Sequence, residues 1–307
     1  TEDYVEAMIQ AYRELIEKCE ENKISWIQFD EPSLVQDMNK KDIELFHKIY
    51  ANILTSAKTS KVLLQTYFGD IRDVYLDVIK MPFAGIGLDF IEGKETYNLI
   101  KKYGFPKDKL LFAGLINGKN IWKNHYEETL KILSSLKEKE IQTVLSTSCS
   151  LLHVPYTLKH EEKLSQDYLS YFSFAEEKLV ELKELSILAN DDDYHKNDLY
   201  QRNTALFARD RKCDNDEVKN RLAGVTENDY IRLPIRNERQ SVQKKALDLP
   251  EFPTTTIGSF PQTKDVKANR SAFRRSEISK QEYVVFNQKK IAECVKWQEE
   301  IGLDVLV

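Results

Sequence analysis

Apolar positions along this chain follow two alternating periods. In the first segment they recur three and four residues apart, which places on one helix face Val5, Met8, Ile9, Tyr12, Leu15, Ile16 and Cys19. The next run, 24–32, is short, rich in β-branched and aromatic residues, and ends at a proline. Helical spacing then returns with Ile43, Phe46, Tyr50, Ile53 and Leu54. The chain therefore opens as helix, strand and helix.

Four more short apolar runs predict strands at 61–68, 84–91, 109–116 and 141–148, with helical spacing between them. These runs are almost continuously apolar, which is typical of parallel strands buried on both faces. Five strand–helix units of this length favour an α/β fold of the (β/α)8 TIM-barrel type, with three further units expected upstream. An open doubly wound sheet shares the alternation, but no glycine-rich phosphate fingerprint follows the first strand.

The second part of the chain has a different pattern. A long helix is predicted over 161–189, followed by a polar stretch, 190–245, that indicates a linker with short helices such as 217–222. Apolar residues that give this linker surface to pack are Leu199, Leu206, Phe207, Val218 and Leu222. Prolines 250 and 253 then introduce the run TTTIGSFPQT at 254–263, a helix over about 279–300, and a strand-like run at 302–307.

Composition narrows the class of protein. The 307 residues are 41% hydrophobic and 31% charged, with a formal net charge of −5, which is ordinary for a soluble globular chain and argues against a nucleic-acid-binding protein. No run of about 18 uncharged apolar residues predicts a membrane span, and no signal peptide opens the chain. Cys19, Cys149, Cys213 and Cys294 show no paired spacing, so we expect free thiols in the cytoplasm and no metal site made from this chain alone.

Several unusual strings resemble one enzyme family. TTTIGSFPQT at 254–263 and WQEEIGLDVLV at 297–307 are similar to the opening of the catalytic barrel of cobalamin-independent methionine synthase. Four strings upstream resemble successive strand ends of that family's N-terminal barrel. They are WIQFDEPSLV, LLQTYF, FAGLINGKNIW and STSCSLLHVP. The order and spacing agree along essentially the whole chain. Because the chain opens without Met, in a helix, and ends within an apparent strand, we expect an internal fragment.

The resemblance implies a domain plan and an activity. Residues 1–189 would form the C-terminal half of the N-terminal barrel, 190–250 the inter-barrel linker, and 251–307 the start of the catalytic barrel. Members of the family are methyltransferases that move a methyl group from 5-methyltetrahydropteroyl-polyglutamate to homocysteine, using zinc and no cobalamin. The zinc ligands and most folate contacts would lie outside these residues. The fragment alone is therefore expected to be inactive, and the intact enzyme to be a cytoplasmic monomer.

One piece of the site carries over to this chain. Ile257, Gly258 and Ser259 match the family's homocysteine-binding segment at the end of the catalytic barrel's first strand. Glycine lets a ligand approach the backbone, the amides can donate to an amino-acid carboxylate, and the serine adds a hydroxyl. Without the surrounding string, the same three residues would indicate only a strand-to-loop turn.

Other polar groups are interpreted as structural. Asp30 and Glu31 look like an acid/base pair, but consecutive strand residues point to opposite faces. Cys149 with His153 resembles a nucleophile and base, yet lacks an orienting third group, so we expect a buried small residue. Asp89 could hold a loop, 117–118 predicts a turn, and the basic cluster Arg270, Arg274 and Arg275 predicts a solvated face.

Two other functions remain open from the residues. The chain could be a non-catalytic binding or scaffold module descended from the family, which the flanking reading frame would decide. It could also be an unrelated barrel hydrolase that uses Asp30 or Glu31, which requires a glycosidase-like activity that Glu31→Gln abolishes.

Overall fold

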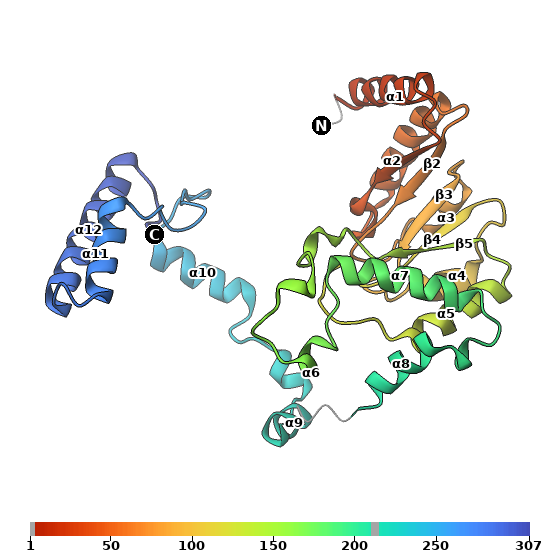
Figure 1. The fold of residues 1–307 in the computed structure, drawn as a ribbon. Coiled ribbons are helices and arrows are strands. Elements are labelled where there is room, and N and C mark those ends of the chain that lie inside the picture. The colour runs from red at the N-terminus through yellow and green to blue at the C-terminus, as the bar shows by residue number, and fades with distance from the viewer. Residues whose placement is uncertain (1–3, 210–214) are drawn as a thin grey trace. The chain divides into compact units, whose positions relative to one another are not determined.

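Five parallel strands organise the first part of the molecule. The structure, a computed structural model, describes residues 4–209 and 215–307 and divides into two compact units, Thr1–Arg211 and Lys212–Val307. The strands of the first unit lie side by side in the order β1-β2-β3-β4-β5 (Figure 1). Their bounds are β1 Trp26–Asp30, β2 Lys61–Gln65, β3 Gly85–Asp89, β4 Leu110–Ile116 and β5 Thr143–Thr147. All five predicted strands and their parallel pairing are confirmed, whereas closure into an eight-stranded barrel stays a prediction.

At least one helix connects each strand to the next. These are α2 (Lys40–Ile53), α3 (Tyr75–Lys80), α4 (Thr96–Tyr103) and α5 (Tyr126–Glu138), with α1 (Val5–Glu21) before the sheet and α7 (Ala175–Ala189) after it. Local sequence fixes the start of α2: the Asn39 side chain accepts hydrogen bonds from the amides of Lys41 and Asp42, and the Asp42 carboxylate accepts one from the Asn39 amide. The alternation of strand and helix defines an α/β architecture.

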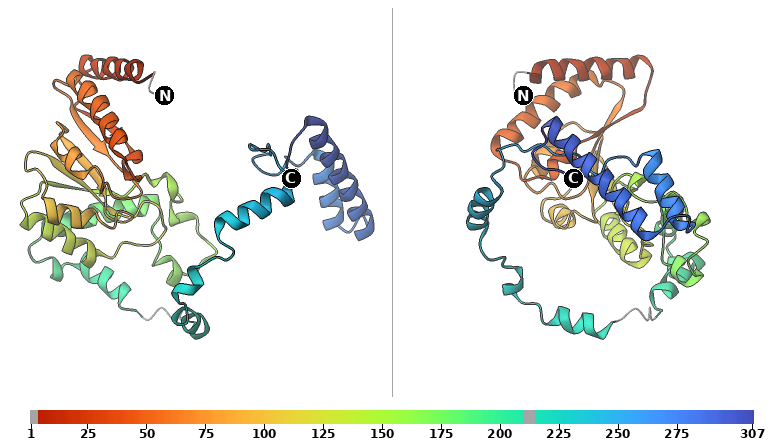
Figure 2. Two further views of the ribbon diagram at one scale, coloured as in Figure 1. Left: turned by 180° about the vertical axis from the view of Figure 1, so that it is seen from behind. Right: turned by 90° about the vertical axis from the view of Figure 1, so that its left-hand side faces the viewer.

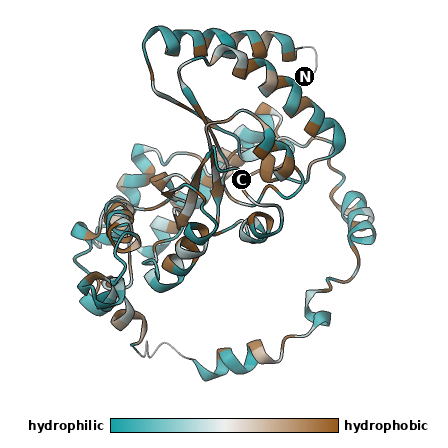
Figure 3. Cartoon of the chain, turned by 90° about the vertical axis from the view of Figure 1, so that its right-hand side faces the viewer, coloured by the Kyte–Doolittle hydropathy of each residue, from teal (hydrophilic) through white to brown (hydrophobic). Residues whose placement is uncertain are grey.

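The core lies between the central strands and the helices packed on them. Leu64, Ile86 and Leu111 are fully buried, and every residue of β3 is buried. Figure 3 shows hydrophobic residues along the sheet and mixed hydrophilic and hydrophobic faces on the helices. Gly114 in β4 is required by close backbone approach, because a Cβ there would lie 2.8 Å from the Ser148 Cα and 2.9 Å from the Leu88 carbonyl oxygen. Burial on both faces accounts for the near-continuous apolar runs of β2, β3 and β4. The prediction of such burial is wrong for β1 and β5, which are partly exposed along their length.

The first helix buries only part of its predicted apolar stripe. It packs against α2 (Figures 1 and 2), and Val5, Ile9 and Ile16 are buried. Tyr12 and Leu15 of the same stripe are 40% and 52% exposed. The helix is therefore amphipathic as predicted, but one side of its apolar face is open in this unit.

The helix predicted over 161–189 is wrong in its first half. A short helix, α6 (Gln166–Leu169), is followed by extended backbone, and α7 begins only at Ala175. The extended part pairs with the chain after β4: the Ser173 amide donates to the Ile121 carbonyl at 2.7 Å, and the Lys123 amide to the Tyr171 carbonyl at 2.8 Å. The Glu177 carboxylate then accepts from the Phe174 amide and starts α7. Tertiary pairing thus overrides a helical pattern.

The end of α1 is tied to the turn before β2 by one carboxylate. Glu20 accepts hydrogen bonds from the amides of Lys58, Thr59 and Ser60 and from the Thr59 hydroxyl. These bonds, the Thr59 hydroxyl first, lower the pKa of Glu20 from 4.5 to about 2. A lowered pKa means that the ionised form stabilises the fold above the unfolded pKa, and that this contribution is lost as pH falls from 4.5 toward 2.

We therefore expect Glu20→Gln to lower the denaturant midpoint of unfolding at pH 7. The deficit should shrink steadily once the pH drops below 4.5, because the wild-type carboxylate is then losing its own contribution. Urea titrations across this range measure it, with Glu21→Gln as the matched control, since Glu21 is an exposed neighbour. A deficit that stays constant with pH would contradict the assignment.

The second unit is helical. It contains α9 (Asp216–Ala223), α10 (Arg236–Leu247), α11 (Lys264–Arg274) and α12 (Lys280–Ile301), and α11 packs against α12. The predicted helix over 279–300 is confirmed, and Ser279 with Glu282 forms its capping box. The strand predicted at 302–307 is wrong: these residues carry no strand assignment. They form hydrogen bonds with Thr254, Thr255 and the helix residue Gln298.

The stretch predicted as a linker is divided between the units. Its first helix, α8 (Asp198–Phe207), contacts α5 and α7 and buries Leu206. Val218 and Leu222 on α9 are 53% and 66% exposed. Cys213 lies outside the described residues. Of the helices in ranges 4–209 and 215–307, none has the length and apolarity needed to cross a membrane.

Candidate functional site

The segment that the sequence singles out, Ile257–Ser259, lies in a loop of the second unit. Thr254 and Thr255, shortly before this segment, lie beside Asp304 and Val305. The amides of Asp304 and Val305 donate to the Thr254 carbonyl at 3.2 and 3.0 Å. The loop therefore leaves a short stretch of paired backbone, as a strand-end site requires, although no strand is formed there.

The three residues have different surroundings. The Ile257 side chain is fully exposed, and a Cβ on Gly258 would meet no atom within 4 Å. Ser259 lines a cleft of about 780 Å³ between this loop and α11 and α12. In the described part of the chain, the amides of Gly258 and Ser259 form no hydrogen bond. These two free N–H groups can donate to a ligand carboxylate, because Gly258 has no side chain to obstruct its approach.

Charged side chains in this cleft are already paired. Lys290 lies 3.0 Å from Asp265 and 2.9 Å from Glu293, and Arg270 donates to the Gln262 side-chain oxygen at 3.0 Å. The Thr263 hydroxyl, followed by Lys290, lowers the pKa of Asp265 to about 2. Outside the cleft, Arg275 binds Glu277. Two members of the predicted basic cluster, Arg270 and Arg275, are therefore already paired, and Arg270 lines the cleft.

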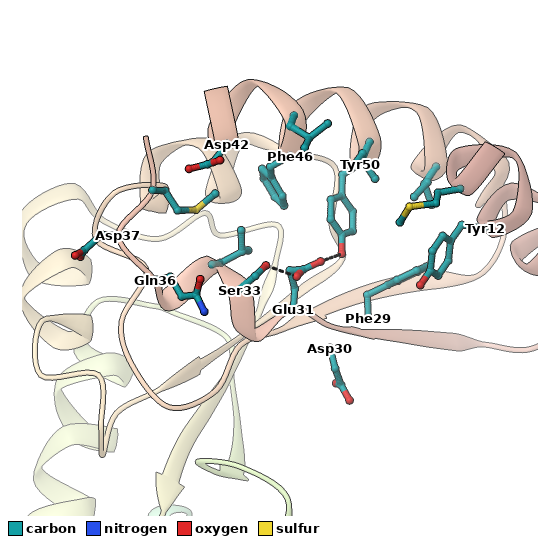
Figure 4. Close-up of a pocket in the computed structure, with 16 residues that line it drawn as sticks. Tyr12, Phe29, Asp30, Glu31, Ser33, Gln36, Asp37, Asp42, Phe46 and Tyr50 are labelled. Carbon is teal, nitrogen blue, oxygen red and sulfur yellow. Dashed lines mark hydrogen bonds between the residues drawn. The ribbon is translucent and has the colours of Figure 1, made fainter. Parts of the chain in front are cut away.

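The carboxylates at the end of β1 point to opposite sides (Figure 4). Glu31 faces a pocket of about 420 Å³ between α1 and α2, where it accepts hydrogen bonds from the Tyr50 and Ser33 hydroxyls. Asp30 points away from Glu31. Its carboxylate accepts hydrogen bonds from the Tyr67 hydroxyl at 2.6 Å and from the Gln28 side-chain Nε2 at 2.7 Å. Burial first, then the bonded carboxylates, raise the pKa of both tyrosines, so the hydroxyls stay donors. The two carboxylates therefore face opposite sides and have different hydrogen-bond partners.

Cys149 does not form a nucleophile–base pair with His153. The thiol is buried and burial raises its pKa, which disfavours the reactive thiolate. The His153 ring instead lies edge-on to Phe68, with ring centroids 5.5 Å apart. Ser148 accepts from the Gly118 amide, and Asn117 accepts from the amides of Lys119 and Asn120, which confirms the predicted turn.

Sequence reasoning missed the residues that hold the candidate loop. Asp304, Gln298 and Thr256 each form hydrogen bonds to its backbone or to the segment beside it. The only signal available was the threonine run before Ile257 and the lone acid in the final apolar run. Across 4–209 and 215–307, no group of three or more His, Cys, Asp or Glu residues could hold a metal ion.

Known proteins match both parts of the chain. The family model described as the cobalamin-independent synthase N-terminal domain matches residues 1–141, and that described as its catalytic domain matches residues 252–307. Three similar proteins carry the name 5-methyltetrahydropteroyltriglutamate–homocysteine methyltransferase. They are 50%, 49% and 48% identical to this chain, and come from Campylobacter jejuni (strain RM1221), Lactococcus lactis subsp. cremoris (strain SK11) and Streptococcus sanguinis (strain SK36).

These matches cover 98%, 100% and 99% of the chain but 40% of each relative, so the chain spans about two fifths of their length. A solved structure, a putative vitamin-B12-independent methionine synthase from Listeria monocytogenes, is 18% identical with a TM-score of 0.46 over 62% of this chain and 55% of its own. That likeness is too low to argue from.

The consecutive strand–helix units place the chain among α/β proteins with a parallel sheet. Its sequence places it more narrowly. The chain belongs to the cobalamin-independent methionine synthase family.

Proposed function

We propose that this chain is part of a methyltransferase that moves a methyl group from 5-methyltetrahydropteroyl-polyglutamate to the sulfur of homocysteine and forms methionine. The observation that carries the proposal is 50% sequence identity, over 98% of this chain, to an enzyme named for this reaction. In this reaction a carbon–sulfur bond forms as the bond from the methyl carbon to nitrogen breaks, and that nitrogen takes up a proton.

The same matches support a proposed domain plan. We propose residues 1–189 as part of the N-terminal (β/α)8 barrel, 190–250 as the linker and 251–307 as the start of the catalytic barrel. The two matching family models fall on the first and third of these ranges, in the same order. Zinc, when bound, supplies a Lewis acid that favours the thiolate of homocysteine. The described residues contain no ligand group for it, and the chain alone is proposed to be inactive.

This chain's own contribution would be to hold the amino-acid end of homocysteine. The amides of Gly258 and Ser259 would donate to the carboxylate, and the Ser259 hydroxyl would add a third donor. Gly258 permits the approach because no atom lies where a side chain would be. Ile257, fully exposed on the same loop, would supply apolar contact to the substrate's carbon chain.

The test is methionine formation by the full-length enzyme that contains this chain. Ser259→Ala should raise the KM for homocysteine roughly 10-fold and leave the KM for the folate substrate unchanged, because one charge-assisted hydrogen bond is lost. Ser241→Ala, an exposed serine on α10, is the matched control. A full-length protein that forms no methionine would favour the scaffold alternative.

A further inference from the structure

Thr254 and Asp304 are joined by an unusually complete set of hydrogen bonds. The Asp304 carboxylate accepts from the Thr254 amide at 2.7 Å and from the Thr254 hydroxyl at 2.8 Å. The Asp304 amide donates back to the Thr254 hydroxyl and carbonyl, both at 3.2 Å. These bonds from Thr254 lower the pKa of Asp304, so the carboxylate is ionised at neutral pH. The start of the candidate loop is therefore fixed to one acid.

That acid is itself held by α12. Gln298 is fully buried on this helix, and its amide group donates to the Val307 carbonyl and accepts from the Val307 amide, each at 3.0 Å. The Leu303 amide donates to the Gln298 backbone carbonyl at 3.1 Å. Both sides of Asp304 are thus anchored to one helix. On the far side of the loop, the Phe260 ring packs on Trp297 of the same helix, with centroids 5.3 Å apart.

Between these two anchors, Thr256 controls the orientation of a single peptide group. Its hydroxyl donates to the Gly258 carbonyl at 2.7 Å. The carbonyl of Gly258 and the amide of Ser259 belong to one planar trans peptide and point in opposite directions. Fixing the carbonyl toward Thr256 therefore turns the Ser259 N–H away from the Thr256 side chain. Because Gly258 has no side chain, nothing else on the residue would resist rotation of this peptide.

We propose that Thr256 and Asp304 are positioning residues that orient the Ser259 amide toward the carboxylate of the amino-acid substrate. The inference rests on the proposed function, since it names the groups that shape the same pocket without touching the ligand. Thr256 acts on the peptide directly, and Asp304 acts by fixing the backbone from which Thr256 reaches it. A donor that is held in place before binding loses less conformational freedom when the ligand arrives.

The test compares KM and kcat for variants of the full-length enzyme. Thr256→Val keeps the shape of the side chain and removes its donor, and should raise the KM for homocysteine roughly 10-fold while kcat and the folate KM change less than about twofold. Thr256→Ser keeps the hydroxyl and should restore the KM for homocysteine to within about twofold of wild type. Asp304→Ala should also raise that KM, and Asp304→Asn less so, because the amide oxygen can still accept from Thr254.

Thr255→Val is the matched control, because the Thr255 hydroxyl donates to the Val305 carbonyl and not to the loop. An equal effect of Thr255→Val and Thr256→Val would overturn the inference in favour of a general structural role. An unchanged homocysteine KM in Thr256→Val, with Ser259→Ala still impaired, would overturn the inference alone. A wild-type enzyme that forms no methionine would overturn the proposed function and the inference together.

Discussion

Asp89→Ala is expected to destabilise the first unit by about 3–5 kcal/mol, because three backbone amides lose their acceptor. The Asp89 carboxylate at the end of β3 is buried and accepts from the amides of Phe68, Ile91 and Glu92 at 2.9, 2.7 and 2.9 Å. These bonds connect the loop after β2 to the loop after β3. Phe68 stands at φ 67°, a left-handed conformation that a non-glycine residue rarely adopts. Its bond to Asp89 opposes that strain.

Equilibrium unfolding in urea, followed by circular dichroism of the full-length protein, would measure the loss. Asp108→Ala is the matched control, because Asp108 is an exposed aspartate in the loop before β4. Asp89→Asn keeps the size of the side chain but places an NH2 group against one of the three amides, so its effect should fall between those of alanine and wild type. An Asp89→Ala protein as stable as its control would show that water replaces the carboxylate.

Lys178 and Glu181 on α7 are expected to give the second large effect. Both side chains are buried, which is unusual for charged residues. The Lys178 ammonium donates to the Trp122 carbonyl at 3.1 Å, and the Glu181 carboxylate accepts from the Asn124 amide at 3.0 Å. Burial lowers the pKa of Lys178 and raises that of Glu181, while the charge of each acts against the shift in the other. Each charge therefore partly compensates the other.

We expect Lys178→Met and Glu181→Leu each to cost about 3 kcal/mol, because each leaves one buried charge without its counter-charge. The double variant should cost less than the sum of the two, since no unpaired charge remains. The quantity to measure, again by urea unfolding, is the difference between the summed costs of the two single variants and the cost of the double variant. Lys183→Met, an exposed lysine on the same helix, should be near neutral. Strict additivity would show that the two charges do not interact.

Local pattern was sufficient to predict most of the fold. Five strands, their parallel pairing and the long C-terminal helix follow from short apolar runs and helical spacing. Prediction failed at 161–174, where helical spacing competes with backbone pairing to Ile121 and Lys123 from another loop. It failed again at 302–307, where an apolar run is bound to one threonine segment and to Gln298. Neither set of partners is visible in local spacing.

The candidate site was predictable only as a string of residues. The resemblance singled out Ile257, Gly258 and Ser259. The hydrogen bonds that Thr256 and Asp304 form in and beside this loop could not be predicted from the sequence. The interpretation of Asp30 and Glu31 as a divided pair followed from strand geometry alone, and the structure confirms it. Periodicity can exclude a joint role for neighbouring residues more readily than it can assign partners far apart in the chain.

The strand order of the first unit has a consequence for synthesis on the ribosome. Because the strands lie in the order β1-β2-β3-β4-β5, each pairs with the one made just before it. As the chain emerges, a new strand and its helix can add to an edge that already exists, without waiting for residues not yet translated. Assembly can thus proceed in the direction of translation. Each new strand covers the exposed edge of the strand before it and so protects that edge from aggregation.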